Sequence, residues 1–224
     1  MKKLLAAGLL GSLSIWAVPL PPGGTLFGPG SPPLLATPAP PYAGSLTAAY
    51  SVNGTNSDGI IRQAVLQSGS DFIFYYQIQT EATSTAPITS LLLRGFNGYT
   101  ISAVTQGLDN PGAPFVDATA GVRPFLVARD PIGNDVTASW VPFGIGPNPP
   151  TLAPGVVSSI LAITVSNAQG FAILGPGATG ALDGSPFNQF APTPEPSFYV
   201  AVSLGLAGLF VARRRKAAAE TTQE

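Results

Sequence analysis

The sequence predicts an all-β fold, with a single antiparallel β-sandwich or jelly-roll-like domain over residues 44–191. In several short segments apolar and polar side chains alternate with a period of two, which is typical of half-buried strands. Turn-forming residues separate these segments at short intervals. Between residues 44 and 194 no segment shows a sustained apolar stripe at the 3.6-residue period of a helix. Many short strands separated by turns favour a sandwich or jelly roll.

The clearest strand is residues 71–79, DFIFYYQIQ. Successive side chains of a strand point to opposite faces, so one face of this segment is predicted to point into the core as a set. That face carries Phe72, Phe74, Tyr76 and Ile78, and the other carries Asp71, Ile73, Tyr75, Gln77 and Gln79. Residues 60–67 precede this strand across Ser68-Gly69-Ser70, a sequence suited to a hairpin loop.

The remaining strand candidates follow the same reasoning. They are residues 45–52, 88–94, 99–105, 125–129, 136–143, 158–166 and 171–174. Turn signals lie between them at Asn53-Gly54, Asn97-Gly98, Asn110-Pro111-Gly112, residues 131–135 and residues 147–150.

A Pro- and Gly-rich segment, residues 18–43, precedes the predicted domain. It contains nine Pro and four Gly, so it cannot donate a regular ladder of backbone hydrogen bonds. The composition predicts an extended linker that leads into the domain. The alternative is that its Leu and Phe side chains pack along the domain.

The charge and residue composition exclude several classes of function. The formal net charge is −1, so no basic field attracts nucleic acid. The chain has no Cys and no His, which removes thiolate metal sites, the usual general base and any Ser–His–Asp triad. Six of the ten basic residues lie in two terminal clusters: Lys2, Lys3, Arg213, Arg214, Arg215 and Lys216.

The N-terminal residues 1–17, MKKLLAAGLLGSLSIWA, have the composition of a signal peptide. Lys2 and Lys3 are followed by an apolar run that is short for a membrane span, and Ala17 offers a small residue for cleavage. We expect export and a mature chain that begins near Val18. The alternative is a buried N-terminal helix of a cytosolic domain.

The C-terminal region combines three parts in order: Pro194-Glu195-Pro196, the uncharged residues 198–212, and the basic residues Arg213, Arg214, Arg215 and Lys216. A helix over residues 197–212 would be about 24 Å long, slightly short of a membrane core of about 30 Å. Long basic side chains can reach the interface and cover the difference. The basic cluster predicts that this end stays cytoplasmic while the domain lies outside.

This tail resembles the PEP-CTERM sorting signal, and the resemblance covers about 30 residues from Pro192 to the end. The resemblance implies a membrane-embedded exosortase as partner, in an envelope that makes exopolysaccharide, with Pro194, Glu195 and Pro196 as the recognition element. Residues 192–216 would form the signal with its transmembrane helix, and residues 217–224 a short cytoplasmic tail that runs past the family's usual ending. The alternative is an ordinary membrane anchor in which Pro-Glu-Pro is accidental.

Two candidate polar sites lie within the predicted domain. Residues 53–59, NGTNSDG, are rich in oxygen ligands for Ca²⁺ but carry one carboxylate, Asp58, so an Asx-rich turn is favoured. Glycosidases need two carboxyl groups at a defined separation. The candidates are Asp109, Asp117, Asp130 and Asp135, of which three stand beside turn residues, so a structural role is favoured.

An aromatic platform for sugar rings is the remaining candidate site. It would consist of Tyr75, Tyr99 and Trp140, although aromatic residues on sheets are more often core or cross-strand partners.

These observations predict a non-catalytic protein with no cofactor and no metal. We expect a membrane-anchored precursor that is sorted by an exosortase to the cell envelope or the extracellular matrix, with the membrane and exopolysaccharide as further partners. The alternatives are a carbohydrate-binding β-sandwich module at the cell surface and an exported hydrolase, against which the absence of His weighs.

Overall fold

A computed structural model describes eight stretches of the chain and, separately, Leu204, Ala207 and Arg213, which are helical. The stretches are residues 18–27, 41–52, 57–106, 112–118, 120–140, 151–174, 180–182 and 185–193. They form an all-β structure in which every pairing between two strands is antiparallel, as the sequence predicted.

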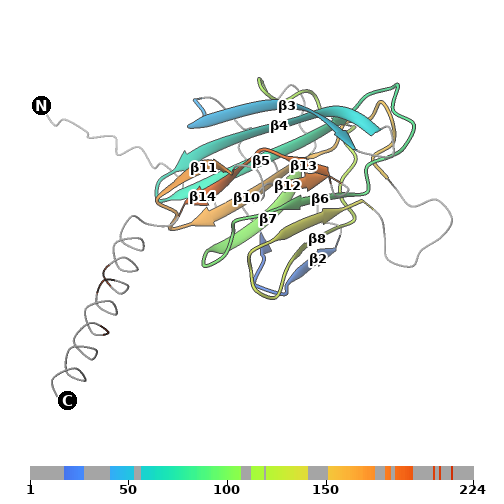
Figure 1. The fold of residues 1–224 in the computed structure, drawn as a ribbon. Coiled ribbons are helices and arrows are strands. Elements are labelled where there is room, and N and C mark those ends of the chain that lie inside the picture. The colour runs from blue at the N-terminus through green and yellow to red at the C-terminus, as the bar shows by residue number, and fades with distance from the viewer. Residues whose placement is uncertain are drawn as a thin grey trace, which may run out of the picture.

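Two six-stranded sheets make up most of the structure (Figure 1). In spatial order the first sheet contains β1 (Val18–Pro19), β7 (Thr100–Gln106), β10 (Ile160–Ser166), β5 (Asp71–Thr80), β4 (Ser57–Ser68) and β3 (Gly44–Val52). The second sheet contains β13 (Ser185–Phe187), β12 (Gly180–Leu182), β6 (Ser90–Leu93), β9 (Val136–Ser139), β8 (Leu126–Arg129) and β2 (Thr25–Phe27). A separate pair consists of β11 (Gly170–Leu174) and β14 (Gln189–Thr193).

The hairpin of β4 and β5 is the longest in the structure that is described. Its strands pair from Gly59↔Thr80 to Ser68↔Asp71, so the loop has two residues, Gly69 and Ser70. Gly69 has a φ of +64°, which suits the first position of a two-residue hairpin turn and which glycine adopts without a Cβ clash.

One apolar cluster joins the two large sheets. Phe74 and Tyr76 of the first sheet lie in the same cluster as Leu91, Leu93 and Val136 of the second, and each is at most 1% exposed. The two sheets therefore share a core in a sandwich-like arrangement. The predicted inward set of β5 is confirmed, because Phe72, Phe74, Tyr76 and Ile78 are all buried in this cluster.

The opposite face of β5 is also buried, which the alternation did not predict. Ile73 and Tyr75 are 3% and 2% exposed and belong to a second cluster that includes Phe115. The loop at residues 112–118 covers this part of the sheet, with the ring centroids of Tyr75 and Phe115 6.1 Å apart. We call this second cluster the outer cluster. It consists of Ala64, Ile73, Tyr75, Phe115, Ile160 and Ala162, with Tyr42 and Leu66 packed against it.

Each of the nine predicted strand segments contains a strand, although several bounds differ. Residues 141–143, which the sequence placed in the strand that includes β9, lie outside the described residues. Five strands were not predicted: β1, β2, β12, β13 and β14.

The predicted linker over residues 18–43 is wrong for its first part. Val18–Pro19 pairs with β7 and Thr25–Phe27 pairs with β8, so these residues extend both sheets. Leu20 between them is fully buried, and this burial outweighs the Pro-rich composition. The strands are short and lie at sheet edges, where the missing N–H of Pro19 is tolerated. Residues 28–40 lie outside the described residues.

The predicted C-terminal boundary of the domain at residue 191 is corrected in the same way. Pro192 and Thr193, assigned from sequence to the tail, pair with Phe171 and Gly170 of β11. The expected signal peptide, residues 1–17, lies outside the described residues. No helix of the described residues is long and apolar enough to cross a membrane.

Candidate functional site

The predicted sorting motif cannot be placed in the fold. Pro194, Glu195 and Pro196 lie outside the described residues, as do Arg214, Arg215 and Lys216. Arg213 is described, and it is helical and exposed.

The candidate Ca²⁺ loop lies mostly outside the described residues, which resume at Ser57. Asp58 is in β4, where its main-chain N–H donates to Ser84 Oγ and its carbonyl accepts from the same hydroxyl, both at 2.9 Å. Among the described residues no group of three or more carboxylates is arranged to hold a metal ion.

The candidate aromatic platform, against which the sequence weighed, is not formed. Tyr75 and Trp140 are each 2% exposed and belong to different clusters, so they do not form one surface for a sugar ring. Trp140 donates its indole N–H to the carbonyl of Val122 at 3.1 Å. Tyr99 is partly buried against the main core. Their role in packing is the alternative that the sequence favoured.

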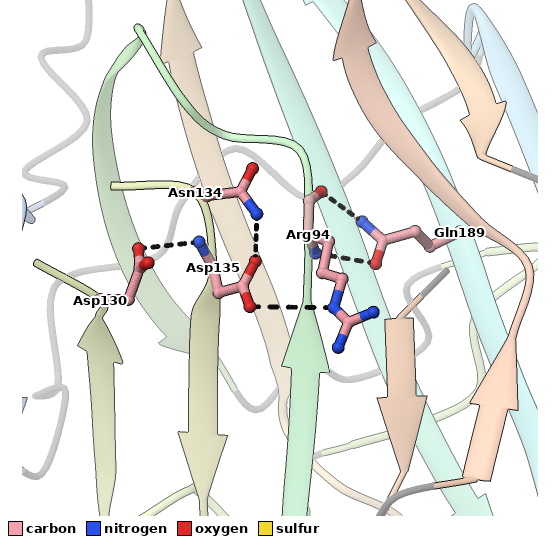
Figure 2. A network of polar contacts seen from close by, with 5 residues as sticks. All are labelled: Arg94, Asp130, Asn134, Asp135 and Gln189. Carbon is pink, nitrogen blue, oxygen red and sulfur yellow. Dashed lines mark hydrogen bonds and ion pairs between the residues drawn. The ribbon is translucent and has the colours of Figure 1, made fainter. Parts of the chain in front are cut away.

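Two of the candidate carboxylates come together at the turn between β8 and β9 (Figure 2). Asp130 Oδ1 accepts the main-chain N–H of Asp135 at 2.9 Å, and the main-chain N–H of Asp130 donates to the carbonyl of Asp135 at 3.0 Å. The Asp130 side chain therefore closes the turn, as Asp commonly does. Asp117 is exposed on the loop at residues 112–118, and Asp109 lies outside the described residues.

Asp135 connects this turn to Arg94, the residue that follows β6. Its Oδ1 accepts from the Asn134 amide, and its Oδ2 lies 3.8 Å from Arg94 Nε. Partial burial raises the pKa of Asp135 above its usual value and the negative charge of Asp130 adds to this, whereas Arg94 and the hydrogen bond from Asn134 oppose it. Both partners of the ion pair are partly exposed, so it contributes little to stability.

Gln189 completes the network on the other side of Arg94 (Figure 2). Its Oε1 accepts the main-chain N–H of Arg94 at 2.9 Å and its Nε2 donates to the carbonyl of Arg94 at 2.8 Å. The side-chain amide thus pairs with the main chain as a neighbouring strand would.

Two other buried glutamines repeat this geometry. Gln77 pairs with both main-chain groups of Val116, with its Nε2 2.9 Å from the carbonyl oxygen and its Oε1 3.0 Å from the nitrogen. Gln63 donates to the carbonyl of Asn188 at 2.7 Å and accepts from the N–H of Phe190 at 3.0 Å. All three glutamines are 0% exposed. Their amides therefore satisfy main-chain groups at sites where a sheet meets a loop or a short strand.

Arg129 serves the same purpose with a charged group. It is 4% exposed, and its guanidinium donates to the carbonyls of Leu20, Phe96, Tyr99 and Gly133 at 2.7 to 3.2 Å. These carbonyls come from three separate connections of the chain. Burial lowers the pKa of Arg129 while Asp130 raises it. This arginine joins the N-terminal segment to the β6–β7 connection and to the β8–β9 turn.

Arg62 is the second buried arginine, and its hydrogen bonding is incomplete. It is 8% exposed, and its Nη2 donates to Gln79 Oε1 at 2.7 Å. Its Nη1 has no hydrogen-bond partner among the residues that the structure describes. Burial lowers the pKa of Arg62, because the charged form is costly away from water.

Sequence reasoning missed these arginines and glutamines as structural groups. One signal was available: Arg62, Arg94, Arg123 and Arg129 are the only basic residues between Val18 and Pro194. In so sparsely charged a segment, an arginine within a strand is a candidate for burial with main-chain partners.

Comparison with known protein families, curated proteins and solved structures finds no match for this chain.

Proposed function

We propose that this chain is an exported, non-catalytic protein of the cell surface or extracellular matrix, sorted through its C-terminal tail by an exosortase. The observation that carries the proposal is the order of parts at the C-terminus: Pro194-Glu195-Pro196, then an uncharged apolar run, then the cluster from Arg213 to Lys216. An apolar helix would hold the tripeptide at a set height outside the membrane, and the basic cluster would keep the helix from slipping through.

The finer architecture belongs to the same proposal. A signal helix over residues 1–17 directs export, and a transmembrane helix within residues 192–216 holds the precursor in the inner membrane. The β domain between them is a single sandwich of the jelly-roll type, and it is delivered to the envelope or to the exopolysaccharide matrix.

The polar groups of the β domain support a non-catalytic role. The buried glutamines and Arg129 bind main-chain groups, and Asp130 closes a turn. Each is therefore already engaged in holding strands and loops together. Glycan binding through the candidate platform of Tyr75, Tyr99 and Trp140 has no support, since Tyr75 and Trp140 are buried.

Glu195 is the residue to test. Glu195→Ala removes no apolar residue from the tail, so we expect insertion to be unchanged and processing to be abolished. Membrane fractionation with immunoblotting for a mass shift measures both. Glu220→Ala is the matched control, because it removes an acidic residue of the same tail beyond the basic cluster.

The proposal predicts that the Glu220→Ala protein is processed like the wild type while the Glu195→Ala protein accumulates as a membrane-bound precursor. An equal processed fraction in all three would leave the tail as a plain membrane anchor.

A further inference from the structure

Arg62 is a buried cation with no opposite charge beside it in the part of the chain that the structure describes. It lies in β4 on the outer face of the first sheet and is 8% exposed. Burial lowers its pKa, and no neighbouring carboxylate offsets this. On the strands that surround it the nearest acidic residues are Asp58 in β4 and Glu81 just after β5. Each is four residues from the register of Arg62 and Gln77, about 13 Å along the strands.

Two other arginines of the domain are compensated, which Arg62 is not. Arg94 Nε lies 3.8 Å from Asp135 Oδ2, and Arg129 donates to four main-chain carbonyls. Arg62 Nη2 donates to Gln79 Oε1 at 2.7 Å, whereas its Nη1 has no hydrogen-bond partner among the described residues. A buried guanidinium with an unused N–H group and no opposite charge is costly. An added group that supplies a negative oxygen would relieve this cost.

The glutamines beside Arg62 supply donors and no further acceptor. A guanidinium can only donate, so Gln79 turns its Oε1 toward Arg62, and the Nε2 of the same amide carries two N–H groups. Gln77 is the cross-strand neighbour of Arg62 in β5, but its Oε1 already accepts the main-chain N–H of Val116. The polarity at this place is therefore the one that an anion requires.

Arg62 also lies close to solvent. Its cross-strand neighbour in β3 is Thr47, and residues directly opposite on antiparallel strands point to the same face. Thr47 is exposed, and Figure 1 shows β3 at the margin of the sheet. The surface therefore begins one strand away from Arg62. Since the arginine itself is mostly covered, the site favours a compact anion.

We infer that Arg62 and Gln79 form a binding site for a small carboxylate, whose oxygens accept from Arg62 Nη1 and from the amide of Gln79. Guanidinium groups suit carboxylates, because their planar N–H groups match the two oxygens. This goes beyond the proposed function and does not depend on the sorting tail. An apolar side chain often replaces a buried charge without loss of stability, so binding accounts for an arginine here better than stability does.

Thermal unfolding of the full-length protein in acetate tests the site. A ligand that binds the folded state raises the unfolding midpoint as its concentration rises. We expect a higher midpoint in sodium acetate than in sodium chloride at the same concentration and pH, and we expect Arg62→Met to lose this difference. Arg123→Met is the matched control, because it removes an exposed arginine of the same domain and should keep the difference.

Arg62→Lys is the second variant, and it keeps a positive charge at the site. A lysine is a point charge without the planar fork of an arginine, so the rise in acetate should be smaller than in the wild type. Glucuronate carries the same group on a sugar ring and distinguishes the source of the carboxylate. A rise as large as that in acetate would assign the site to acidic sugars, and a smaller one to free small carboxylates.

Two results would overturn the inference. One is an equal midpoint for the wild type in acetate and in chloride. The other is a difference between the two salts that stays the same in Arg62→Met and Arg62→Lys as in the wild type, since it would then be a general effect of the salt on the protein. Circular dichroism of each variant before heating shows that the fold is retained.

Discussion

The two faces of the first sheet differ in how they are covered. The inner face packs large apolar side chains such as Phe74 and Ile163 against the second sheet in the main core. The outer face carries the smaller outer cluster, and on the same side of β4 and β5 lie the polar residues Arg62 and Gln77. Alternate residues of the same strands therefore make two layers of different chemistry. We infer that the inner face carries most of the folding free energy, whereas the outer face positions a loop.

The largest expected effect is the loss of Phe74 from the inner face. Phe74 is 0% exposed and lies edge-on to Phe96, with ring centroids 6.1 Å apart. Phe74→Ala should lower the free energy of unfolding by about 3–5 kcal/mol, since it leaves a cavity that the sheets cannot collapse to fill. Urea denaturation measures this loss, with the dependence of the unfolding free energy on urea concentration expected to stay unchanged.

Phe115→Ala is the matched change on the outer face. Phe115 is 5% exposed but comes from a loop, which can move to reduce the cavity. We expect a smaller loss, about 2 kcal/mol. Equal losses for the two variants would contradict the difference between the faces.

Alkaline pH should destabilise the fold through the outer cluster. Burial, together with the charge of Tyr42, raises the pKa of Tyr75 to about 12, and burial raises the pKa of Tyr42 to about 12. The ordinary value in an unfolded chain is about 10, so the folded state favours the neutral phenols. Their contribution to stability is fully present below about pH 10 and is lost as the pH rises through about 12.

Absorbance of tyrosinate and circular dichroism, followed together from pH 9 to 13, test this expectation. Tyr75→Phe should reduce the loss of stability over that range. Ionisation of both tyrosines near pH 10 with the fold intact would show that the outer cluster is open to water.

The smallest expected effect is that of Arg62. Its buried guanidinium donates to Gln79, and its Nη1 has no hydrogen-bond partner among the described residues. Arg62→Met removes the charge but keeps an unbranched apolar stem, so we expect a change within about 1 kcal/mol, or a gain. Arg129→Met is the contrast, because it removes the donor from four carbonyls and should be strongly destabilising. A large loss for Arg62→Met would mean that this arginine stabilises the fold through more than its bond to Gln79.

The local pattern of apolar and polar residues was sufficient to predict much of the fold. The alternation in β5 predicted its inward face correctly, because the period of two is a property of the strand itself. It could not predict that the other face is buried, since Phe115 lies 40 residues after Tyr75.

The strands that were missed depend on distant partners. β1 and β2 are short and lie in a Pro-rich segment, yet they pair with β7 and β8, and Pro192 belongs to β14 because it pairs with Phe171. Arg129 is a similar case, since its acceptors come from three connections that no sequence pattern links. The proposed sorting motif is the opposite case, because it is inferred from the local order of three parts of the sequence and needs no tertiary contact.

The proposed function requires that the chain is exported and processed at its C-terminal tail. The intact mass of the protein recovered from the cell envelope tests it most directly, because one spectrum reports both ends. We expect a mature chain that begins near Val18 and whose mass is altered at the tail that carries Pro194-Glu195-Pro196. A soluble cytoplasmic species with the full mass from Met1 to Glu224 would contradict the account.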